Sequence, residues 1–243
     1  MSDGSLTLSP VGHLQSPYRD KFAVPRQPGL VRHARGRLQL LPPFNDPHTL
    51  RGIEQYTHLW LIFHFHQCPP GVWHPTVRPP RLGGNERMGV FATRSPFRPN
   101  PLGLSVVRLL GVGQQGGQVW LDLEGVDLVD GTPIFDIKPY VPFVDSQPEA
   151  HSDFAAAPPQ TRDVAFSAQA EADLTHTTAD YPHLRDFIHD VLAQDPRPAY
   201  HQEADADREY GMHLYDFNVR WQMQGERLQV LAVTPWPAES TND

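Results

Sequence analysis

Short runs of apolar residues, separated by turn signals, dominate the first 145 residues of the chain. Runs of this length are typical of β-strands, and the pair Gly116–Gly117 marks a turn between two of them. Helical periodicity is weak throughout this part, which favours an all-β barrel or sandwich. The predicted strands are Leu6–Leu14, Leu38–Leu41, His58–His66, Leu104–Leu110 and Val119–Leu123.

The pattern changes after residue 145. Residues 146–163 lose apolar periodicity and are typical of a linker. The segment Tyr181–Ala193 carries apolar residues at helical spacing, so we expect a helix there. The chain is therefore predicted to be mainly β, with a β-barrel-like N-terminal domain over residues 1–145, a linker and a small α+β C-terminal domain over 164–243. Further expected elements are a strand at Val164–Ala168, a short helix at Ala170–Leu174 and a hairpin of Phe217–Gln222 with Arg227–Val233.

Composition narrows the class of protein. A chain of 243 residues can bury a full core, and it holds no run of about 18 apolar residues that could span a membrane. Its first residues lack the basic and apolar parts of a signal peptide. The single cysteine, Cys68, excludes an intramolecular disulfide and a cysteine-cluster metal site. We expect a soluble cytoplasmic protein.

The net charge of −8 is unevenly distributed. Residues 1–100 carry 12 of the 20 Lys and Arg residues but only 5 of the 28 acids. Such asymmetry is typical of a polyanion-binding face, although the two halves of a sequence need not be two halves of a molecule.

The segment Arg78–Ser105, called the arginine loop below, is dense in arginine, proline and glycine. Its 28 residues include five arginines, five prolines, four glycines and one acid. Proline restricts the backbone in advance, so such a loop loses little entropy when it binds a ligand. Arginines on a stiff loop suit phosphate or carboxylate recognition, because their planar guanidinium groups must be aimed. The alternative is a proline-rich connection between two strands.

A second dense segment, Val126–Tyr140, is acidic. Asp130–Gly131 predicts a turn between strands at Asp127–Val129 and Ile134–Ile137, which would gather three aspartates near one edge. Lys138, one of two lysines in the chain, and Tyr140 lie beside them. Alternatively, Asp130 and Gly131 only build the turn and Lys138 neutralises a neighbouring acid.

Other site signatures are weak. His64 and His66 would share one face of a strand, but no third metal ligand follows at suitable spacing, so no metal is expected. The chain has no dinucleotide fingerprint, phosphate-binding P-loop or nucleophile elbow.

The arginine loop and DLVDGTPIFDIKPYVPF closely resemble motifs of the TsaA/TrmO family, S-adenosylmethionine-dependent tRNA N6-methyltransferases. SPYRDKFAVPRQPGL, HLWLIFHFHQ, LAQDPRPAY and YDFNVRW are similar to its proteobacterial branch, so the resemblance covers almost the whole chain. It implies a β-barrel methyltransferase, usually a homodimer, that methylates N6 of threonylcarbamoyladenosine beside the tRNA anticodon.

The same resemblance implies site residues. An aspartate of the acidic segment could accept the ribose hydroxyls or face the sulfonium, and Arg94 could hold the methionine carboxylate. The implied S-adenosylmethionine contacts are Arg26, Gln27, Pro28, His66, Gln67, Arg94, Leu104, Asp127, Leu128, Val129 and Asp130.

The proton acceptor and the RNA contacts come from the residues themselves. Asp136, Tyr140 and His66 are the candidates for the general base. The candidates for tRNA contacts are Arg78, Arg81, Arg87, Arg98, Lys138, Arg197 and Arg220.

Two other classes of protein remain open. A non-catalytic tRNA-binding module would use the arginine loop but no cofactor. A phosphoesterase would use the aspartates to hold a divalent metal.

Overall fold

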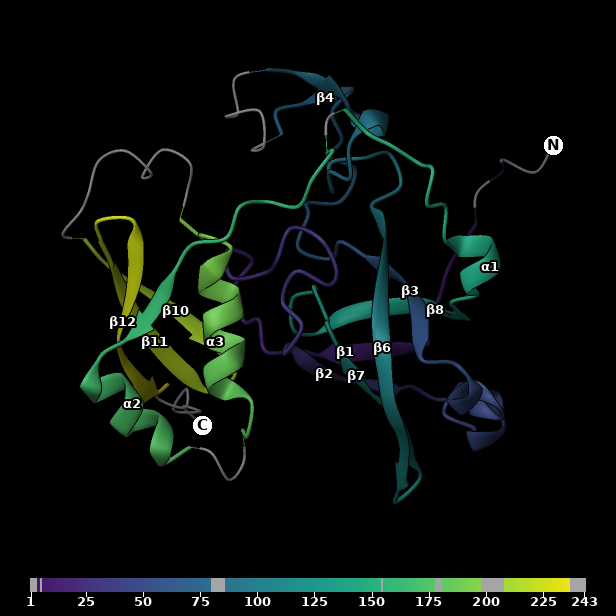
Figure 1. Cartoon of the computed structure of the whole chain (residues 1–243). Helices are drawn as coiled ribbons and strands as arrows, with labels where there is room; N and C mark the ends of the chain where they lie inside the picture. Colours follow the sequence, from purple (N-terminus) through teal and green to yellow (C-terminus); the bar gives the residue numbers. More distant parts are fainter. Residues whose placement is uncertain are drawn as a thin grey trace.

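The computed structural model describes residues 4, 6–79, 86–153, 155–177, 181–197 and 208–236. Its larger part is a closed six-stranded barrel in the order β1-β2-β7-β6-β3-β8 (Figure 1). Alternate residues of β3 and β7 are buried, which is the period of a strand with one face in the core. The strands are β1 (Gly12–Gln15), β2 (Arg35–Leu40), β3 (His58–His64), β6 (Leu102–Gln115), β7 (Gln118–Glu124) and β8 (Thr132–Pro139).

The barrel confirms most of the predicted strands, with two corrections. The strand expected at Leu6–Leu14 is confined to β1, because Pro10 lacks an N–H group for a ladder and the residues before it are exposed. The strand expected at Asp127–Val129 is a loop. The Ser16 hydroxyl donates to Leu128 O at 2.6 Å and the Thr132 hydroxyl to Val129 O at 2.6 Å, so side chains satisfy carbonyls that a ladder would otherwise use.

Between β3 and β6 the chain leaves the barrel as a long excursion, drawn above it in Figure 1. This segment includes the two-stranded ribbon of β4 (Thr76–Val77) and β5 (Met88–Gly89), followed by the one-turn helix η4 (Val90–Ala92). Two further one-turn helices, η1 (Pro47–Leu50) and η2 (Ile53–Gln55), lie at the lower right of the same view. The arginine loop is therefore displayed at one end of the barrel.

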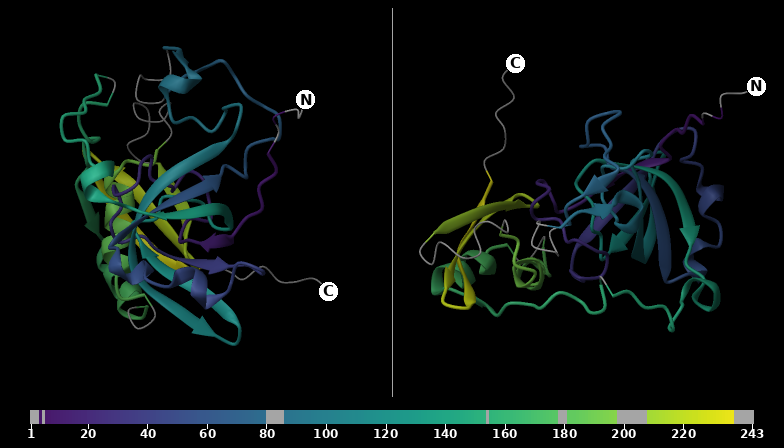
Figure 2. Two further views of the ribbon diagram at one scale, coloured as in Figure 1. Left: turned by 90° about the vertical axis from the view of Figure 1, so that its right-hand side faces the viewer. Right: turned by 90° about the horizontal axis from the view of Figure 1, so that it is seen from above.

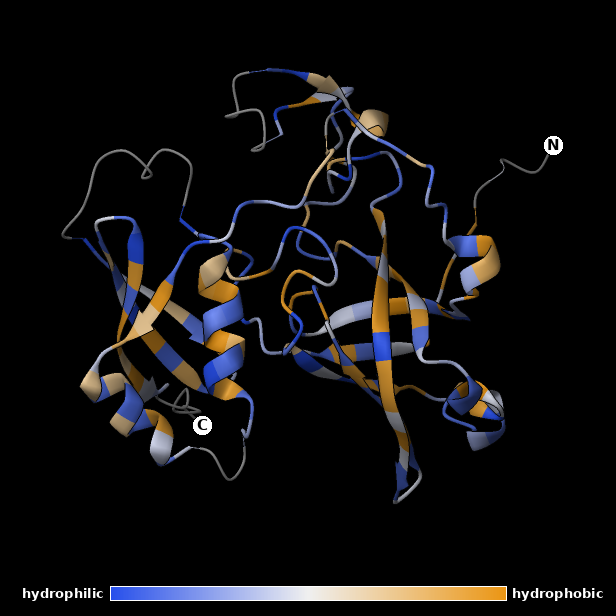
Figure 3. Ribbon diagram, viewed as in Figure 1, coloured by the Kyte–Doolittle hydropathy of each residue, from blue (hydrophilic) through white to orange (hydrophobic). Residues whose placement is uncertain are grey.

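The C-terminal part is a four-stranded sheet in the order β10-β11-β12-β9 with two principal helices. Both helices are confirmed, as α2 (Ala168–Thr175) and α3 (Leu184–Ala193), and Figure 3 shows hydrophobic and hydrophilic residues alternating along α3. The predicted hairpin is confirmed. The strand before it, Glu209–Leu214, was not predicted, because Gly211 and polar residues interrupt its apolar pattern. The strands are β9 (Val164–Phe166), β10 (Glu209–Leu214), β11 (Phe217–Gln224) and β12 (Arg227–Pro235).

Barrel and C-terminal part share one continuous set of buried residues. Tyr18 is fully buried, bridges to Leu214 of β10, and its ring lies 5.7 Å from that of Phe187 on α3. A short helix, α1 (Pro142–Asp145), ends the barrel part, and the described residues from there to β9 form no helix or strand (Figure 2). The prediction of a mainly β chain with a barrel and a small α+β part is confirmed. No helix in the described ranges is long and apolar enough to cross a membrane.

Candidate functional site

A surface hollow of about 1680 Å³, called the large hollow below, lies against the arginine loop. The segment after β1 contributes Arg26, Gln27 and Leu30, and the linker contributes Ser152 and residues 155–160. Among the described residues, the lining contains no aspartate or glutamate. The remaining lining residues are His74, Pro75, Thr76, Val77, Arg78, Pro79, Arg87, Phe91, Ala92, Thr93, Arg94, Ser95, Pro96 and Phe97.

Local hydrogen bonds hold this side of the loop in shape. Val90 is buried and its N–H donates to Pro75 O at 3.0 Å, which fastens η4 to the residues before β4. The Thr93 hydroxyl donates back to Val90 O at 2.9 Å and accepts from the Ser95 N–H at 3.2 Å. Such side-chain turns replace a ladder in a segment interrupted by prolines.

Two implied cofactor residues that are 67 positions apart meet in the large hollow. Arg94 Nη1 donates to Gln27 Oε1 at 2.5 Å. Since Gln27 is neutral, the charge of Arg94 is oriented without being neutralised. The guanidinium therefore stays available for an anionic ligand.

Asp127 lies close enough to Arg94 for the arginine to lower its pKa. Burial is the stronger effect and raises the pKa of Asp127 to about 6, against the hydrogen bond from Ser105 and the charge of Arg94. Ser105, fully buried on β6, donates its hydroxyl to Asp127 Oδ1. A cationic ligand beside this carboxyl would lower its pKa and keep it ionised. Ser105 was missed because a single serine in an apolar strand carries no signal of its own.

Asp130 is placed differently from Asp127. Its two oxygens accept from the Ser16 N–H, at 2.8 Å, and from Arg19, so it ties its loop to the segment after β1. It lines a second, smaller hollow between the barrel and the C-terminal part, whereas Arg26, Gln27 and Arg94 line the large hollow. The cofactor contacts implied for Asp130 and Arg94 thus fall on different surfaces.

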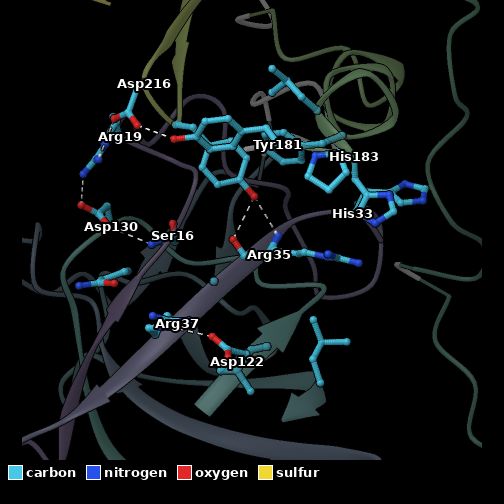
Figure 4. A pocket seen from close by; sticks show the side chains of 18 of the residues that line it. Ser16, Arg19, His33, Arg35, Arg37, Asp122, Asp130, Tyr181, His183 and Asp216 are labelled. Carbon is cyan, nitrogen blue, oxygen red and sulfur yellow. Dashed lines mark hydrogen bonds and ion pairs between the residues drawn. The ribbon is translucent and has the colours of Figure 1, made fainter. Parts of the chain in front are cut away.

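The smaller hollow, about 840 Å³, lies between the barrel and the C-terminal part (Figure 4). Tyr215 reaches across it, and its hydroxyl bonds both the N–H and the carbonyl of Arg35, at 3.3 and 3.2 Å. Each arginine of this hollow has an acidic partner: Arg19 with Asp130 and Asp216, Arg37 with Asp122, and Arg35 with Glu124. The surface is charge-balanced and suits a domain junction better than a polyanion site.

The other implied cofactor residues are spread out. Pro28 is half-buried, Gln67 is exposed, and Leu128 is buried in the core. Leu104 is 52 % exposed and lies on β6 directly opposite Ile62 of β3.

The three candidates for the base do not meet. Tyr140 packs near His58 at one end of β3, with ring centroids 6.3 Å apart, whereas His66 follows the other end. A seven-residue strand is about 20 Å long, so these two cannot act on one atom. Asp136 is paired with Lys138 at 3.1 Å.

His66 is the candidate nearest to the arginine loop. The N–H of its neighbour Phe65 donates to Pro101 O at 2.9 Å. Partial burial, assisted by His64, lowers the pKa of His66, which favours the neutral imidazole that a base requires. Within the described ranges no third Cys, His, Asp or Glu joins these histidines to form a metal site.

The structure separates the predicted tRNA contacts. Arg78 and Arg87 line the large hollow, Arg98 is half-buried outside it, and Arg81 lies outside the described residues. The prediction for Arg197 is not supported: it is only 6 % exposed and forms two 2.7 Å hydrogen bonds with Asp195, which leaves little of it for a phosphate. Lys138 and Arg220 are exposed but paired, with Asp136 and Glu209.

A contrast in pairing distinguishes the large hollow. Most arginines elsewhere in the described chain have an acidic partner, but the four in this lining have none. Two of them have neutral partners: Arg87 donates to the Thr76 hydroxyl at 3.2 Å, and Arg94 donates to Gln27. An acid-free hollow with four unneutralised arginines matches a ligand rich in negative charge. The unpaired arginines are Arg26, Arg78, Arg87 and Arg94.

Comparisons with known proteins agree along the chain. The family model of the tRNA-methyltransferase O N-terminal domain matches residues 13–146, and that of the TrmO C-terminal domain matches residues 159–236. The tRNA (adenine(37)-N6)-methyltransferase of Escherichia coli K12 is 51 % identical over 232 residues, which cover 95 % of this chain and 99 % of that protein.

Two relatives from Pseudomonas aeruginosa extend this picture. A protein that carries the name of an S-adenosylmethionine-dependent methyltransferase is 48 % identical over 88 % of this chain and 91 % of its own. The crystal structure of TrmO from this organism superposes with a TM-score of 0.79 at 40 % identity, covering 95 % of this chain and 98 % of that one.

Proposed function

The chain belongs to the tRNA-methyltransferase O family, and on that premise we propose that it transfers a methyl group from S-adenosylmethionine to N6 of threonylcarbamoyladenosine beside the tRNA anticodon. The family and the prediction of a methyltransferase are confirmed by the match along the whole chain. The observation that carries the proposal is the acid-free, arginine-lined hollow that includes the Arg94–Gln27 pair, with Asp127 and Ser105 nearby.

The residues present fit S-adenosylmethionine. Arg94, oriented by Gln27, would bind the methionine carboxylate. Asp127, held by Ser105, would accept the ribose hydroxyls or face the sulfonium, and a positive charge there would offset the cost of its burial. When bound, the cofactor supplies an electrophilic methyl group on a positively charged sulfur.

The remaining task of the protein is to orient the adenosine and accept its N6 proton. Orientation of two reactants can supply about 7–11 kcal/mol of the barrier. The N6 hydrogen of a carbamoylated adenine is more acidic than that of adenine, so a weak base suffices. Among the three candidates we assign this role to His66, which is held largely neutral and lies near the end of the arginine loop.

A homodimer is part of this proposal. Leu104, Phe143 and Val144 expose 52, 88 and 55 % of their surface, and Trp60 Nε1 ties α1 to the outside of β3 through a 3.1 Å bond to Asp145. Large apolar side chains exposed in this way are typical of a contact between subunits.

The first test is isothermal titration with S-adenosylmethionine, comparing the native chain with Arg94→Ala. We expect saturable binding that is weakened at least tenfold by the substitution, because a charged bond to the carboxylate contributes about 1.5–3 kcal/mol. Methyl transfer is then measured on tRNA with and without the threonylcarbamoyl group, and only the modified tRNA should be a good substrate.

Three outcomes separate the alternatives. Binding of tRNA without any S-adenosylmethionine binding, even with tRNA present, would identify a non-catalytic RNA-binding module. Equal methylation of both tRNAs would refute the threonylcarbamoyl preference alone. Unchanged cofactor affinity in Arg94→Ala would show that another residue holds the carboxylate.

A further inference from the structure

Two phenylalanines of the arginine loop line the large hollow with their rings exposed to solvent. Phe91 is 78 % exposed and Phe97 is 37 % exposed. Leaving an aromatic ring of this size exposed forgoes the hydrophobic stabilisation that its burial would contribute. Exposed aromatics at the rim of a hollow are therefore candidates for ligand contact.

Neither ring is on a loose tail. Phe91 is in η4, between the buried Val90 and Thr93, whose N–H donates to Val90 O at 3.1 Å. The Phe97 N–H donates to the Ser95 hydroxyl at 3.3 Å, and its ring lies 5.7 Å from that of His74. Both backbones are held before any ligand arrives, so binding would cost little ordering entropy.

The charge around these rings is of one sign. The same hollow is lined by Arg26, Arg78, Arg87 and Arg94, none of which has an acidic partner. The chain as a whole, by contrast, has a net charge of −8. Arginines that track a phosphate backbone, interleaved with aromatics that stack bases, are the common solution for binding single-stranded nucleic acid.

The hollow is also larger than a cofactor requires. Small-molecule sites usually measure about 300–1,000 Å³, whereas this one measures about 1680 Å³. The excess leaves room for nucleotides beside the cofactor. The linker residues Ala155–Pro159 add an apolar wall without a charged side chain.

Resting on the proposed function, we propose that Phe91 is a stacking platform for an unpaired base of the substrate RNA, with Phe97 as a second platform in the same hollow. The ligand class is single-stranded RNA in the loop that contains the reactive adenosine. The arginines bind its phosphates and the two rings bind its bases.

The test is tRNA binding by fluorescence anisotropy at several salt concentrations, with the native chain, Phe91→Ala and Phe91→Trp. We expect Phe91→Ala to weaken binding by about 5- to 150-fold, the usual loss for one stacked base, and Phe91→Trp to retain native affinity. The salt dependence of the Phe91→Ala variant should be unchanged, because stacking releases no counterions. By contrast, Arg87→Ala should reduce the slope by about one.

Two controls accompany these variants. Phe44→Ala removes a ring that is as exposed as that of Phe97. Phe44 lies three residues before η1 and does not line the large hollow, so this variant should bind tRNA as the native chain does. The circular dichroism spectrum and melting temperature of each phenylalanine variant should match those of the native chain, which reports that the variants are folded.

Native tRNA affinity in Phe91→Ala, while the native chain binds and methylates tRNA, would overturn this inference and leave the proposed function intact. A loss that Phe91→Trp does not restore would indicate packing rather than stacking and would also overturn it. If the native chain does not bind tRNA, the proposed function fails and this inference fails with it.

Discussion

Asp127 shows how one residue combines a cost in stability with a role in binding. Its hydroxyl partner, Ser105, comes from the inside of β6, and Arg94 of the arginine loop lies close enough to lower its pKa. Burial raises its pKa to about 6, so in the folded chain the carboxyl is harder to ionise than in the unfolded chain. Sites that bind cations often keep such a destabilising charge.

Asp127→Asn should therefore stabilise the chain in a pH-dependent way. Between about pH 4 and pH 6 the folded form holds a proton that the unfolded form releases, so native stability falls as pH rises through this window. An asparagine side chain does not ionise, so the variant does not lose stability over this pH range. Its advantage in free energy of unfolding should grow to at most about 3 kcal/mol above pH 6 and vanish near pH 4.

Urea unfolding at pH 4, 6 and 8 checks this prediction, with Asp122→Asn as a control on the surface of β7. S-adenosylmethionine binding should weaken in Asp127→Asn at the same time. If the native and variant chains were equally stable at pH 8, burial of the ionised Asp127 carboxylate would not destabilise the fold, and the prediction would be wrong.

At the scale of elements, close contacts set the shape of the long strand β6. Gly103 lies opposite Phe63 of β3, and a Cβ on it would come within 2.1 Å of the phenyl ring. Gly111 of the same strand would meet nothing within 4 Å. The arginine loop enters β6 beside the first of these glycines, so the ring of Phe63 packs where the loop returns to the barrel.

Gly103→Ala should lower the free energy of unfolding by about 1–3 kcal/mol, because the buried Phe63 must leave its position. Gly111→Ala is the matched control and should change stability by less than about 0.5 kcal/mol. Thermal and urea unfolding measure both. Similar losses for the two variants would show that backbone freedom, and not the contact with Phe63, decides the need for glycine.

At the scale of the whole molecule, two surfaces carry different kinds of chemistry. The junction of barrel and C-terminal part is closed by Tyr18, by the hydroxyl of Tyr215 and by balanced ion pairs such as Arg19 with Asp216. The four arginines of the large hollow, where the linker passes, have no acidic partner among the described residues. The charge asymmetry seen in the sequence thus corresponds to a local basic site on an acidic molecule.

The proposed homodimer is tested by Phe143→Glu, a charge placed on the most exposed phenylalanine of the described chain. We expect light scattering after size exclusion to give a dimer mass for the native chain and a monomer mass for the variant, because burying an unpaired carboxylate is costly. Lys21→Glu, an exposed change away from α1, should remain dimeric. A monomeric native chain at micromolar concentration would refute the dimer.

Elements whose signal is local could be predicted from the residues alone: the alternation in β3 and β7, the helical spacing of α3, and the restricted backbone of a loop rich in proline and arginine. Contacts between residues far apart along the chain depend on the tertiary structure. The fold pairs Arg94 with Gln27, places Ser105 against Asp127 and separates Tyr140 from His66. Burial and charge pairing act through space, so the residues that form a site become visible only once the barrel is closed.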